Sequence, residues 1–360
     1  MHVYFFGVYN AQGGMENYAL NLISGMKKKY TDVDFTLLVF KNEFSGKDIY
    51  LKNNYSDYII LPDFFKHPIM FLRSFKELGK KVGSSDLIQL NVCTFRNFLL
   101  FWAVSKLNCR RIIVSHYSKN DDGLAILHYI NRKLFHKKYQ NLAVSDIAGE
   151  FMFKNDYTVI PNGVVSEKYA FNSDARRRIR EHHGIDENTF LIGQVGRITK
   201  EKNQDFSIDV LKKICKKYNN VKLMLVGKYY NDEIKKLIDQ SGLSEKVLLT
   251  GPIYDEIGQY YSAFDCFILP SKNEAMPIAL LEALSNGLPT VYSKNVPSLD
   301  IKPSQLGELP FLKLDLNTEL WVRNLSNIIE SPEYSRENYI QDSEYELTHF
   351  VDTYHDIYIG

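Results

Sequence analysis

Residues 266–293, CFILPSKNEAMPIALLEALSNGLPTVYS, combine two apolar runs with a helical pattern between them. The runs at 266–270 and 290–293 have the length and composition of buried strands. Pro277 suits the first position of a helix, and Gly287 suits the position that ends one. A strand, a helix and a second strand in close succession predict a parallel β-sheet.

The same alternation of apolar runs and amphipathic stretches continues along the whole chain. Apolar runs of this kind predict strands that are buried on both faces, as in a parallel sheet covered by helices. Further strands are expected at 2–8, 34–40, 58–61, 87–90, 111–116, 141–145, 158–161, 190–196, 221–227 and 247–251. In the second half, helices are expected at 202–218, 230–241, 254–264 and 277–286. The predicted fold class is therefore α/β.

A polar, charged stretch divides this pattern near the middle of the chain. Asn162-Gly163 is a turn signal, and the following residues, SEKYAFNSDARRRIREHHG, are too polar for a central strand. We expect two Rossmann-like, doubly wound domains that face each other across a cleft and bind ligands at the carboxyl ends of their strands. The expected divisions are 1–165, 166–335 and a C-terminal helical tail, 336–360, that returns towards the first domain.

Composition and charge narrow the class of protein. The 360 residues exceed what one core usually organises, which also favours two domains. The formal net charge of +1 speaks against a nucleic-acid partner. Four cysteines without a CxxC pair predict neither a metal site nor a disulfide framework. The chain shows no signal-peptide pattern and no apolar run near the roughly 18 residues of a membrane span, so a cytoplasmic protein is expected.

Two glutamates, Glu274 and Glu282, raise the question of function, because one precedes the helix of the opening stretch and the other lies inside it. Backbone N–H groups of Ala275, Met276 and Ile278 would gather at the positive end of that helix, where a phosphate can bind. Carboxylates on either side could accept hydrogen bonds from ribose and sugar hydroxyls, so the spacing suits a sugar nucleotide. The plain alternative is that both glutamates are solvated.

A second candidate stretch, VGRITKEKNQD (195–205), follows an expected strand and precedes an expected helix. Arg197 and Lys202 could both point to the ligand end of the sheet, where two cations would offset the charge of a diphosphate. Such cations favour a transition state in which a nucleotide diphosphate departs. A solvated basic turn is the alternative.

Two weaker signals lie in the first half of the chain. Gly13-Gly14 follows the first strand and would allow close approach of a ligand to the backbone, although the GxGxxG fingerprint of dinucleotide binding is absent. His116 ends an expected strand at the ligand side of the sheet. It either contacts a transferred sugar or simply caps the next loop.

Taken together, five short motifs resemble those of the family-4 retaining glycosyltransferases. They are GGME (13–16), VSHYS (114–118), VIPNGV (159–164), GRITKEKN (196–203) and the glutamate pair at 274 and 282. The resemblance covers nearly the whole chain. It implies the GT-B fold, an N-terminal acceptor domain, a C-terminal donor domain, a nucleotide-sugar donor that is most often UDP-linked, retention at the anomeric carbon, and no metal or other cofactor.

The resemblance also implies roles for individual residues. Arg197 and Lys202 match the pair that holds the donor diphosphate, and Glu282 matches the ribose ligand. Glu274 matches the glutamate beside the sugar ring. Gly14 matches the backbone that approaches the donor, and His116 matches a histidine near the 6-position of the sugar. Two departures are Ala275, where glycine is common, and KNVPSLD (294–300), which lacks a frequent Gly-Gly.

The acceptor is expected on the N-terminal domain. Residues 64–81, FFKHPIMFLRSFKELGKK, combine aromatic and basic side chains, as does 94–110 to a lesser degree. Such a pattern fits either an anionic membrane surface or a helix with one buried face. A membrane site would suit a glycan or polyprenyl-diphosphate-linked acceptor in surface-polysaccharide or capsule assembly. The expected mechanism is front-face transfer, in which the leaving diphosphate accepts the proton of the acceptor hydroxyl.

Three other functions compete with sugar transfer as explanations of this pattern. A sugar-nucleotide epimerase shares the fold but not the combination of GRITKEKN with the glutamate pair. A nicotinamide dehydrogenase would need GxGxxG. A non-catalytic subunit of a transferase complex usually lacks one of the four charged residues Arg197, Lys202, Glu274 and Glu282, which this chain retains.

Overall fold

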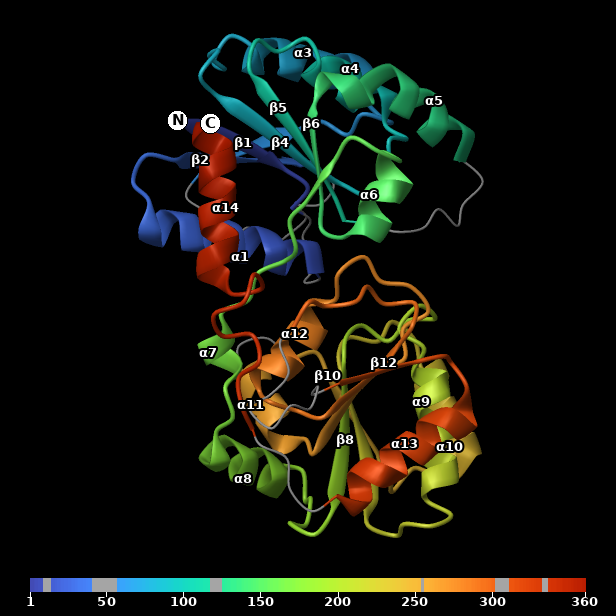
Figure 1. The fold of residues 1–360 in the computed structure, drawn as a ribbon. Coiled ribbons are helices and arrows are strands. Elements are labelled where there is room, and N and C mark those ends of the chain that lie inside the picture. Colours follow the sequence, from blue (N-terminus) through green and yellow to red (C-terminus); the bar gives the residue numbers. More distant parts are fainter. Residues whose placement is uncertain (9–13, 41–56, 117–124, 254–255, 302–310, 332–335) are drawn as a thin grey trace. The chain divides into compact units, whose positions relative to one another are not determined.

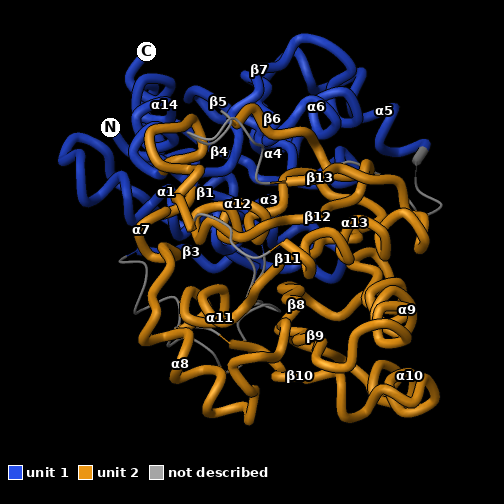
Figure 2. Tube along the Cα trace, turned by 60° about the horizontal axis from the view of Figure 1, so that its bottom comes forward, with its two compact units in different colours: residues 1–163, 347–360 blue, residues 164–346 orange. Residues whose placement is uncertain are grey.

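Two units, each built on a parallel sheet, make up the chain in this computed structural model (Figures 1 and 2). Residues 1–163 and 347–360 form unit 1, and residues 164–346 form unit 2. The structure describes the whole chain except residues 9–13, 41–56, 117–124, 254–255, 302–310 and 332–335.

Unit 1 has seven parallel strands in the order β3-β2-β1-β4-β5-β6-β7. The strands are β1 (His2–Phe6), β2 (Asp34–Phe40), β3 (Tyr58–Leu61), β4 (Leu87–Val92), β5 (Arg110–Ser115), β6 (Gln140–Ala143) and β7 (Thr158–Val159). The helices are α1 (Gly14–Lys29), α3 (Pro68–Leu78), α4 (Phe98–Val104), α5 (Ala125–Phe135), the 3₁₀ turn His136–Lys138, α6 (Asp146–Met152) and α14 (Leu347–Ile359). Helices α3, α4 and α5 lie along one side of the sheet, while α1 and α14 lie together on the other (Figure 1).

Unit 2 has six parallel strands in the order β10-β9-β8-β11-β12-β13. They are β8 (Phe190–Val195), β9 (Val221–Val226), β10 (Val247–Gly251), β11 (Cys266–Leu269), β12 (Thr290–Ser293) and β13 (Phe311–Leu314). The helices are α7 (Ser166–Tyr169), α8 (Ser173–His182), α9 (Gln204–Ile214), α10 (Glu233–Ser241), α11 (Ile257–Ala263), α12 (Ile278–Ser285) and α13 (Thr318–Glu330). The strand order reverses between β8 and β11, and ligands of open α/β sheets bind at the carboxyl ends of strands beside such a switch.

The expected α/β class is confirmed, and each expected strand is present with ends shifted by no more than two residues. Strand β13 was missed, because FLKL is a short, half-exposed edge strand that only its pairing with β12 defines. Helix α9 begins at Gln204, not at residue 202 as expected, because Asn203 has a left-handed backbone with φ 59°. Helix α12 ends as expected before Gly287, whose φ is +69°.

The chain passes between the units at two neighbouring places. It leaves unit 1 after Gly163, two residues before the division that we expected, and re-enters it at Leu347. Within unit 2, Val164 forms a parallel bridge with Glu346, and its N–H donates to the carbonyl of Tyr345 at 2.9 Å. Residues 336–346, which the sequence analysis grouped with the C-terminal helices, belong to unit 2, whereas α14 belongs to unit 1.

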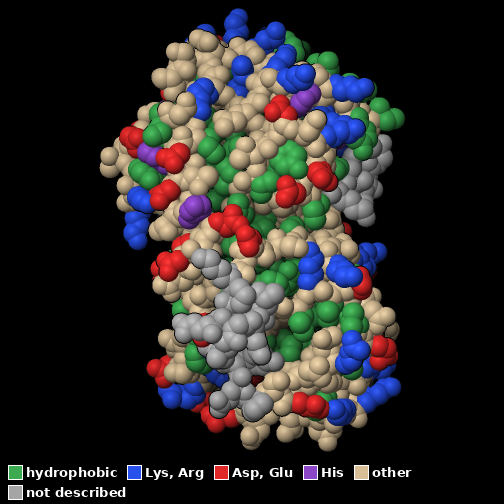
Figure 3. Space-filling model, viewed as in Figure 1, with side chains coloured by type: hydrophobic (Ala, Val, Ile, Leu, Met, Phe, Trp, Pro, Cys, Tyr) green, Lys and Arg blue, Asp and Glu red, His purple; other side chains and the backbone are tan. Residues whose placement is uncertain are grey.

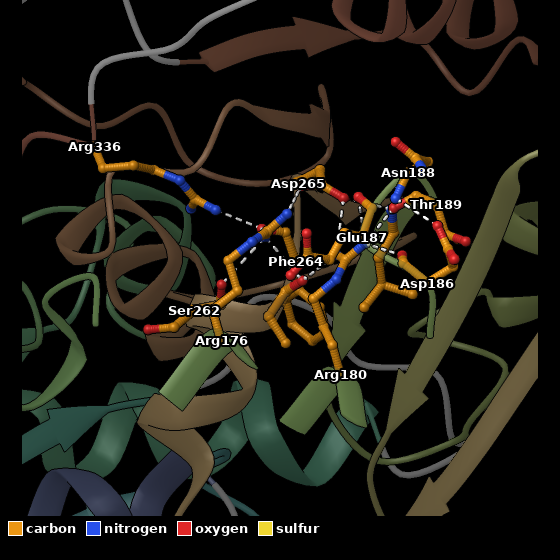
Figure 4. Close-up of polar contacts among 12 residues, drawn as sticks. Arg176, Arg180, Asp186, Glu187, Asn188, Thr189, Ser262, Phe264, Asp265 and Arg336 are labelled. Carbon is orange, nitrogen blue, oxygen red and sulfur yellow. Dashed lines mark hydrogen bonds and ion pairs between the residues drawn. The ribbon is translucent and has the colours of Figure 1, made fainter. Parts of the chain in front are cut away.

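Arginine side chains secure the amino ends of strands β8 and β11 (Figure 4). Arg180, whose side chain is 4% exposed, donates to Asp265 at 3.2 Å and to the carbonyls of Ala263, Asp186, Glu187 and Thr189. Arg176 donates to the other oxygen of Asp265 at 2.6 Å. Burial lowers the pKa of Arg180 in spite of this carboxylate. The cluster ties helix α8 to the sheet at the end opposite to the predicted ligand site.

Candidate functional site

The loops after β8 and β11 meet beside the switch in strand order. The side chain of Asn203 donates to the carbonyl of Pro270 at 3.1 Å, and the N–H of Lys272 donates to the carbonyl of Glu201 at 2.7 Å. These two bonds join the segments that carry Arg197 and Lys202 on one side and Glu274 on the other. Two motifs that are about seventy residues apart in sequence therefore share one local structure.

An ion pair lies at the centre of this junction. The Lys202 ammonium donates to Oε1 of Glu274, and the two side chains are only 21% and 13% exposed. Ser271 donates to the same carboxylate oxygen at 2.8 Å. A partly buried pair with an added hydroxyl donor has a better defined geometry than an exposed pair. The predicted phosphate and sugar ligands Lys202 and Glu274 are thus brought together.

Arg197 lies in the same loop, but its side chain is exposed. Its backbone is well placed: its carbonyl accepts from Gln204 at 3.1 Å, and the next N–H, of Ile198, donates to Lys228 at 2.9 Å. Gly227 packs against this loop with φ +153°, and a Cβ there would lie 1.9 Å from the carbonyl oxygen of Gly196. Only glycine permits this contact, so the end of β9 helps to shape the loop that carries Arg197.

Glu282 is buried inside α12, 4% exposed, and is not a solvated helix residue. Oε2 accepts from the hydroxyl of Tyr261 at 2.6 Å, and Tyr169 is a second hydroxyl donor. Burial raises the pKa of Glu282, while the two tyrosines and the charges of Lys168 and Lys202 oppose that rise. The helix begins one residue later than expected, at Ile278, with Pro277 before it. Met276 and Ile278 are buried, and Ala275 is half-buried.

Of the residues predicted in the first half, Gly13 lies outside the described residues, and Gly14 is the exposed first residue of α1. His116 follows β5 directly and is partly exposed. Its Nε2 lies 3.2 Å from Oδ1 of Asn91. Its ring packs edge to face against that of Tyr18, with the two ring centroids 4.4 Å apart. Burial lowers the pKa of His116 to about 3, so the ring is neutral at physiological pH.

Comparison with known proteins assigns the chain. A family model described as glycosyl transferases group 1 matches residues 175–301. EpsF of Bacillus subtilis (strain 168), provisionally named a glycosyltransferase, is 24% identical over 340 residues, which is 91% of this chain and 87% of EpsF. The UDP-Gal:alpha-D-GlcNAc-diphosphoundecaprenol alpha-1,3-galactosyltransferase of Escherichia coli is 34% identical over 145 residues, 38% of this chain and 36% of that enzyme. The chain is a glycosyltransferase, and its residues 175–301 match the group 1 model.

The fold of this glycosyltransferase agrees with that assignment. Anabaena Alr3699/HepE, solved in complex with UDP, superposes with a TM-score of 0.79 over 99% of both chains at 15% identity. The expected GT-B fold is therefore confirmed. The segment that matches the family model contains the loops after β8 and β11 and helix α12, which carry every residue predicted in unit 2.

Several polar residues that support the site of this glycosyltransferase were not found from the sequence. Gln194, buried within β8, donates to the carbonyl of Lys202 at 2.8 Å and accepts from Ser207 at 2.7 Å. Tyr261 and Tyr169 cover Glu282 from α11 and α7. A glutamine in an otherwise apolar strand was the available signal for Gln194, because a buried amide needs partners. The tyrosines had no such local signal.

Two kinds of feature are absent from the described part of the chain. Among the described residues of the glycosyltransferase, no three or more His, Cys, Asp or Glu side chains are grouped so that they could hold a metal ion. Within the same residues, no helix has the length and apolar character needed to cross a membrane.

Proposed function

We propose that this glycosyltransferase is a retaining, family-4 enzyme that transfers a sugar, a hexosyl or N-acetylhexosaminyl unit, from a nucleotide diphosphate sugar to a hydroxyl group. The observation that carries the proposal is the Lys202–Glu274 pair, which joins the loops after β8 and β11 beside the switch in strand order. A cation for the diphosphate and a carboxylate for the sugar are thus adjacent, as a donor with that order of groups requires. UDP is the preferred nucleotide, since HepE was solved with UDP and the relative from Escherichia coli is named for UDP-Gal.

The donor would change the pairing at this junction. Lys202, which donates to Glu274 in this structure, would direct an N–H group to a phosphate oxygen of the donor. The exposed Arg197 would supply a second cation. Negative charge grows on the diphosphate as it leaves, so both cations stabilise the transition state more than the ground state. Glu274 would then be free to accept hydrogen bonds from sugar hydroxyls. The backbone at Ala275, Met276 and Ile278, before and at the start of α12, adds the positive end of the helix.

Glu282 remains the proposed ribose ligand. Its oxygens accept hydroxyl groups of Tyr261 and Tyr169 in this structure. A carboxylate has about four lone-pair sites, so ribose hydroxyls can join the two phenols without replacing them. The tyrosines would then hold the carboxylate in position for the ribose.

Product analysis tests this proposal directly. We expect the purified protein to transfer sugar from one of a panel of UDP- and GDP-sugars, in the presence of EDTA, and to retain the donor's anomeric configuration in the NMR spectrum of the product. The inverted anomer would contradict front-face transfer. Loss of activity in EDTA would contradict metal independence. Epimerised donor without transfer would favour an epimerase, and neither transfer nor donor hydrolysis with any donor would favour a non-catalytic subunit.

We further propose that unit 1 lies on the cytoplasmic face of an anionic membrane, where it meets a glycan or polyprenyl-diphosphate-linked acceptor for surface polysaccharide. Helix α5 supports this, because it buries polar side chains and exposes apolar ones, the reverse of an ordinary surface helix. The side chains of His128, Asn131 and Arg132 are buried. Five large side chains are exposed, namely Ile126, Leu127, Tyr129, Ile130 and Leu134. Neighbouring α3 and α4 expose Ile69, Met70, Phe98 and Trp102. Exposed apolar side chains on three adjacent helices are typical of a docking surface.

Charge on these helices favours lipid headgroups over a neutral partner. Exposed lysines accompany the apolar residues, at Lys66, Lys76, Lys80, Lys81, Lys133, Lys137 and Lys138. The acidic residues of 64–116 and 125–138 are only Glu77, which pairs with Lys80, and Asp86. Figure 3 shows Lys and Arg side chains gathered over the end of unit 1 that carries these helices. Basic groups beside apolar ones bind anionic membrane surfaces at about 1 kcal/mol for each Lys or Arg.

Liposome flotation tests the membrane proposal. Wild-type protein is expected to float with vesicles that contain phosphatidylglycerol and to remain in solution with phosphatidylcholine alone. Replacing Lys66, Lys76, Lys80 and Lys81 by glutamate, or Ile126 and Ile130 by serine, is expected to abolish flotation. A matched control changes Lys212, Lys216, Lys217 and Lys222 of unit 2 to glutamate and should float normally. Equal binding to both lipids would contradict the proposal.

A further inference from the structure

A buried chain of hydrogen bonds runs from the C-terminal helix α14 through the sheet of unit 1 to His116. Tyr358 of α14 donates to Oε1 of Gln89 at 2.6 Å. Nε2 of Gln89 donates to Oδ1 of Asn91 at 3.0 Å, and the same oxygen lies 3.2 Å from Nε2 of His116. Gln89 and Asn91 are alternate residues of β4 and are at most 1% exposed. Buried amides in a strand need partners, and here each amide oxygen is bonded to other members of this hydrogen-bond chain.

One backbone carbonyl decides which groups donate and which accept along these hydrogen bonds. The side chain of Asn91 lies 2.8 Å from the carbonyl oxygen of Phe6, which can only accept. The atom that faces Phe6 must therefore be the amide nitrogen, so the opposite atom, Oδ1, can only accept as well. Both groups that approach Oδ1, the Gln89 amide and Nε2 of His116, must then be donors. The proton of a neutral His116 accordingly lies on Nε2.

The hydrogen bonds of Gln89, at the end away from His116, are consistent with this assignment. With its nitrogen directed to Asn91, Gln89 also donates to the hydroxyl of Tyr18 at 3.1 Å, which uses both of its N–H groups. Its oxygen then faces Tyr358, which donates to it. The hydroxyl of Tyr18 in turn donates to the hydroxyl of Tyr354 at 2.7 Å. Both amide hydrogens of Gln89 and one of Asn91 have acceptors, and turning either amide over would bring two acceptors together.

We propose that Asn91, supported by Gln89 and Tyr358, is a positioning residue that holds His116 as a neutral imidazole protonated on Nε2, so that its Nδ1 presents a lone pair to a hydroxyl group of the ligand. The inference rests on the proposed function for the identity of that ligand, a donor sugar. His116 in this state accepts a hydrogen bond from a hydroxyl and repels phosphate or carboxylate oxygens, which carry no proton. The C-terminal helix thereby contributes to ligand selection without contacting the ligand.

The protonation state can be read without any ligand. In protein labelled with ¹⁵N-histidine, the nine histidines of the protein give separate ring signals, and the His116→Gln variant identifies the signal of residue 116. We expect the pattern of the Nε2–H tautomer, unchanged between pH 5 and 9, because the pKa of His116 is about 3. The Nδ1–H pattern, or an imidazolium that titrates near pH 6.5, would overturn the inference whatever the activity of the enzyme.

Variants of Asn91 test its positioning role. Asn91→Leu removes the acceptor, so a mixture of His116 tautomers and about a tenfold fall in kcat/KM are expected, the worth of one neutral hydrogen bond. Asn91→Asp keeps an acceptor and should keep the Nε2–H tautomer, with the pKa of His116 raised by the carboxylate. Thr353→Ala, on the same helix but outside these hydrogen bonds, is the control and should leave the spectrum unchanged.

The outcomes separate this inference from the proposed function. An unchanged tautomer in Asn91→Leu would overturn the role of Asn91, and if that variant does not fold, the tautomers of wild type and Asn91→Asp decide. A wild-type Nε2–H signal in a protein that transfers no sugar would count against the proposed function and leave the positioning of His116 standing. An active enzyme without the Nε2–H signal would contradict the positioning of His116 and leave the proposed function standing.

Discussion

Replacing Lys202 by methionine is expected to lower the rate of sugar transfer about 10²–10³-fold, the usual cost of removing one group that stabilises developing charge. Methionine retains the length of the side chain and removes only the cation. The loss should appear in kcat as well as in kcat/KM, because the diphosphate gains charge as it leaves and the ammonium is worth most in the transition state. Initial rates with the donor identified from the panel, over a range of concentrations, measure both constants.

Lys200→Met is the matched control for this prediction. Lys200 lies two residues away in the same loop and is exposed, so its loss should change the rate by less than about threefold, as expected for a screened surface charge. Glu274→Gln separates the two members of the ion pair. If Lys202 serves only to hold Glu274, Lys202→Met and Glu274→Gln together will cost no more than either alone. A combined loss larger than each single loss indicates separate contacts with the donor, as we propose.

Arg180→Met is expected to destabilise unit 2 by about 1–3 kcal/mol, the cost of leaving buried hydrogen-bond acceptors without donors. The change removes the N–H donor of the carbonyl of Thr189 and one of the two arginines that contact Asp265, while Arg176 still contacts Asp265 and the carbonyl of Ala263. Buried acceptors that lose their donors account for most of such a cost. Stabilities of domains are commonly about 5–15 kcal/mol, so this loss is a measurable part of the stability of unit 2.

Urea unfolding followed by tryptophan fluorescence measures this effect. The chain has two tryptophans, and Trp321 is fully buried in unit 2, so a Trp102→Phe background reports on that unit alone. Arg177→Met on the same helix is the control, because its pair with Asp174 is exposed and worth about 0.5 kcal/mol or less. A midpoint for Arg180→Met equal to that of Arg177→Met would show that the cluster in Figure 4 does not stabilise the unit.

Local sequence patterns were sufficient for the elements of the fold. Continuous apolar runs such as Val221–Val226 can be buried only in a sheet that is covered on both sides, and they were assigned correctly. The turn at Asn162-Gly163 placed the passage between the units within two residues of its observed position. Strand β13 could not be assigned in this way, because FLKL gains strand character from its neighbour β12 and not from its own sequence.

The candidate site was predictable as a set of loops but not as a set of contacts. Glu274 was expected in a loop and Glu282 within a helix, and both are found there. That Lys202 would pair with Glu274 required the loops after β8 and β11 to be adjacent, which only the strand order decides. The tyrosines that cover Glu282 come from two other helices, and no spacing along the chain could have indicated them.

The sequence by itself determined where strands, helices and loops lie, because periodicity, glycine and proline act over a few residues. Tertiary structure decided which side chains meet: the outward-facing apolar residues of α5, the arginines around Asp265, and the hydrogen bonds that lead from Tyr358 to His116. Hydrogen bonds and ion pairs depend on distances of about 3 Å between atoms that are far apart along the chain. Those distances exist only once the sheets have formed and the C-terminal helix has packed against unit 1.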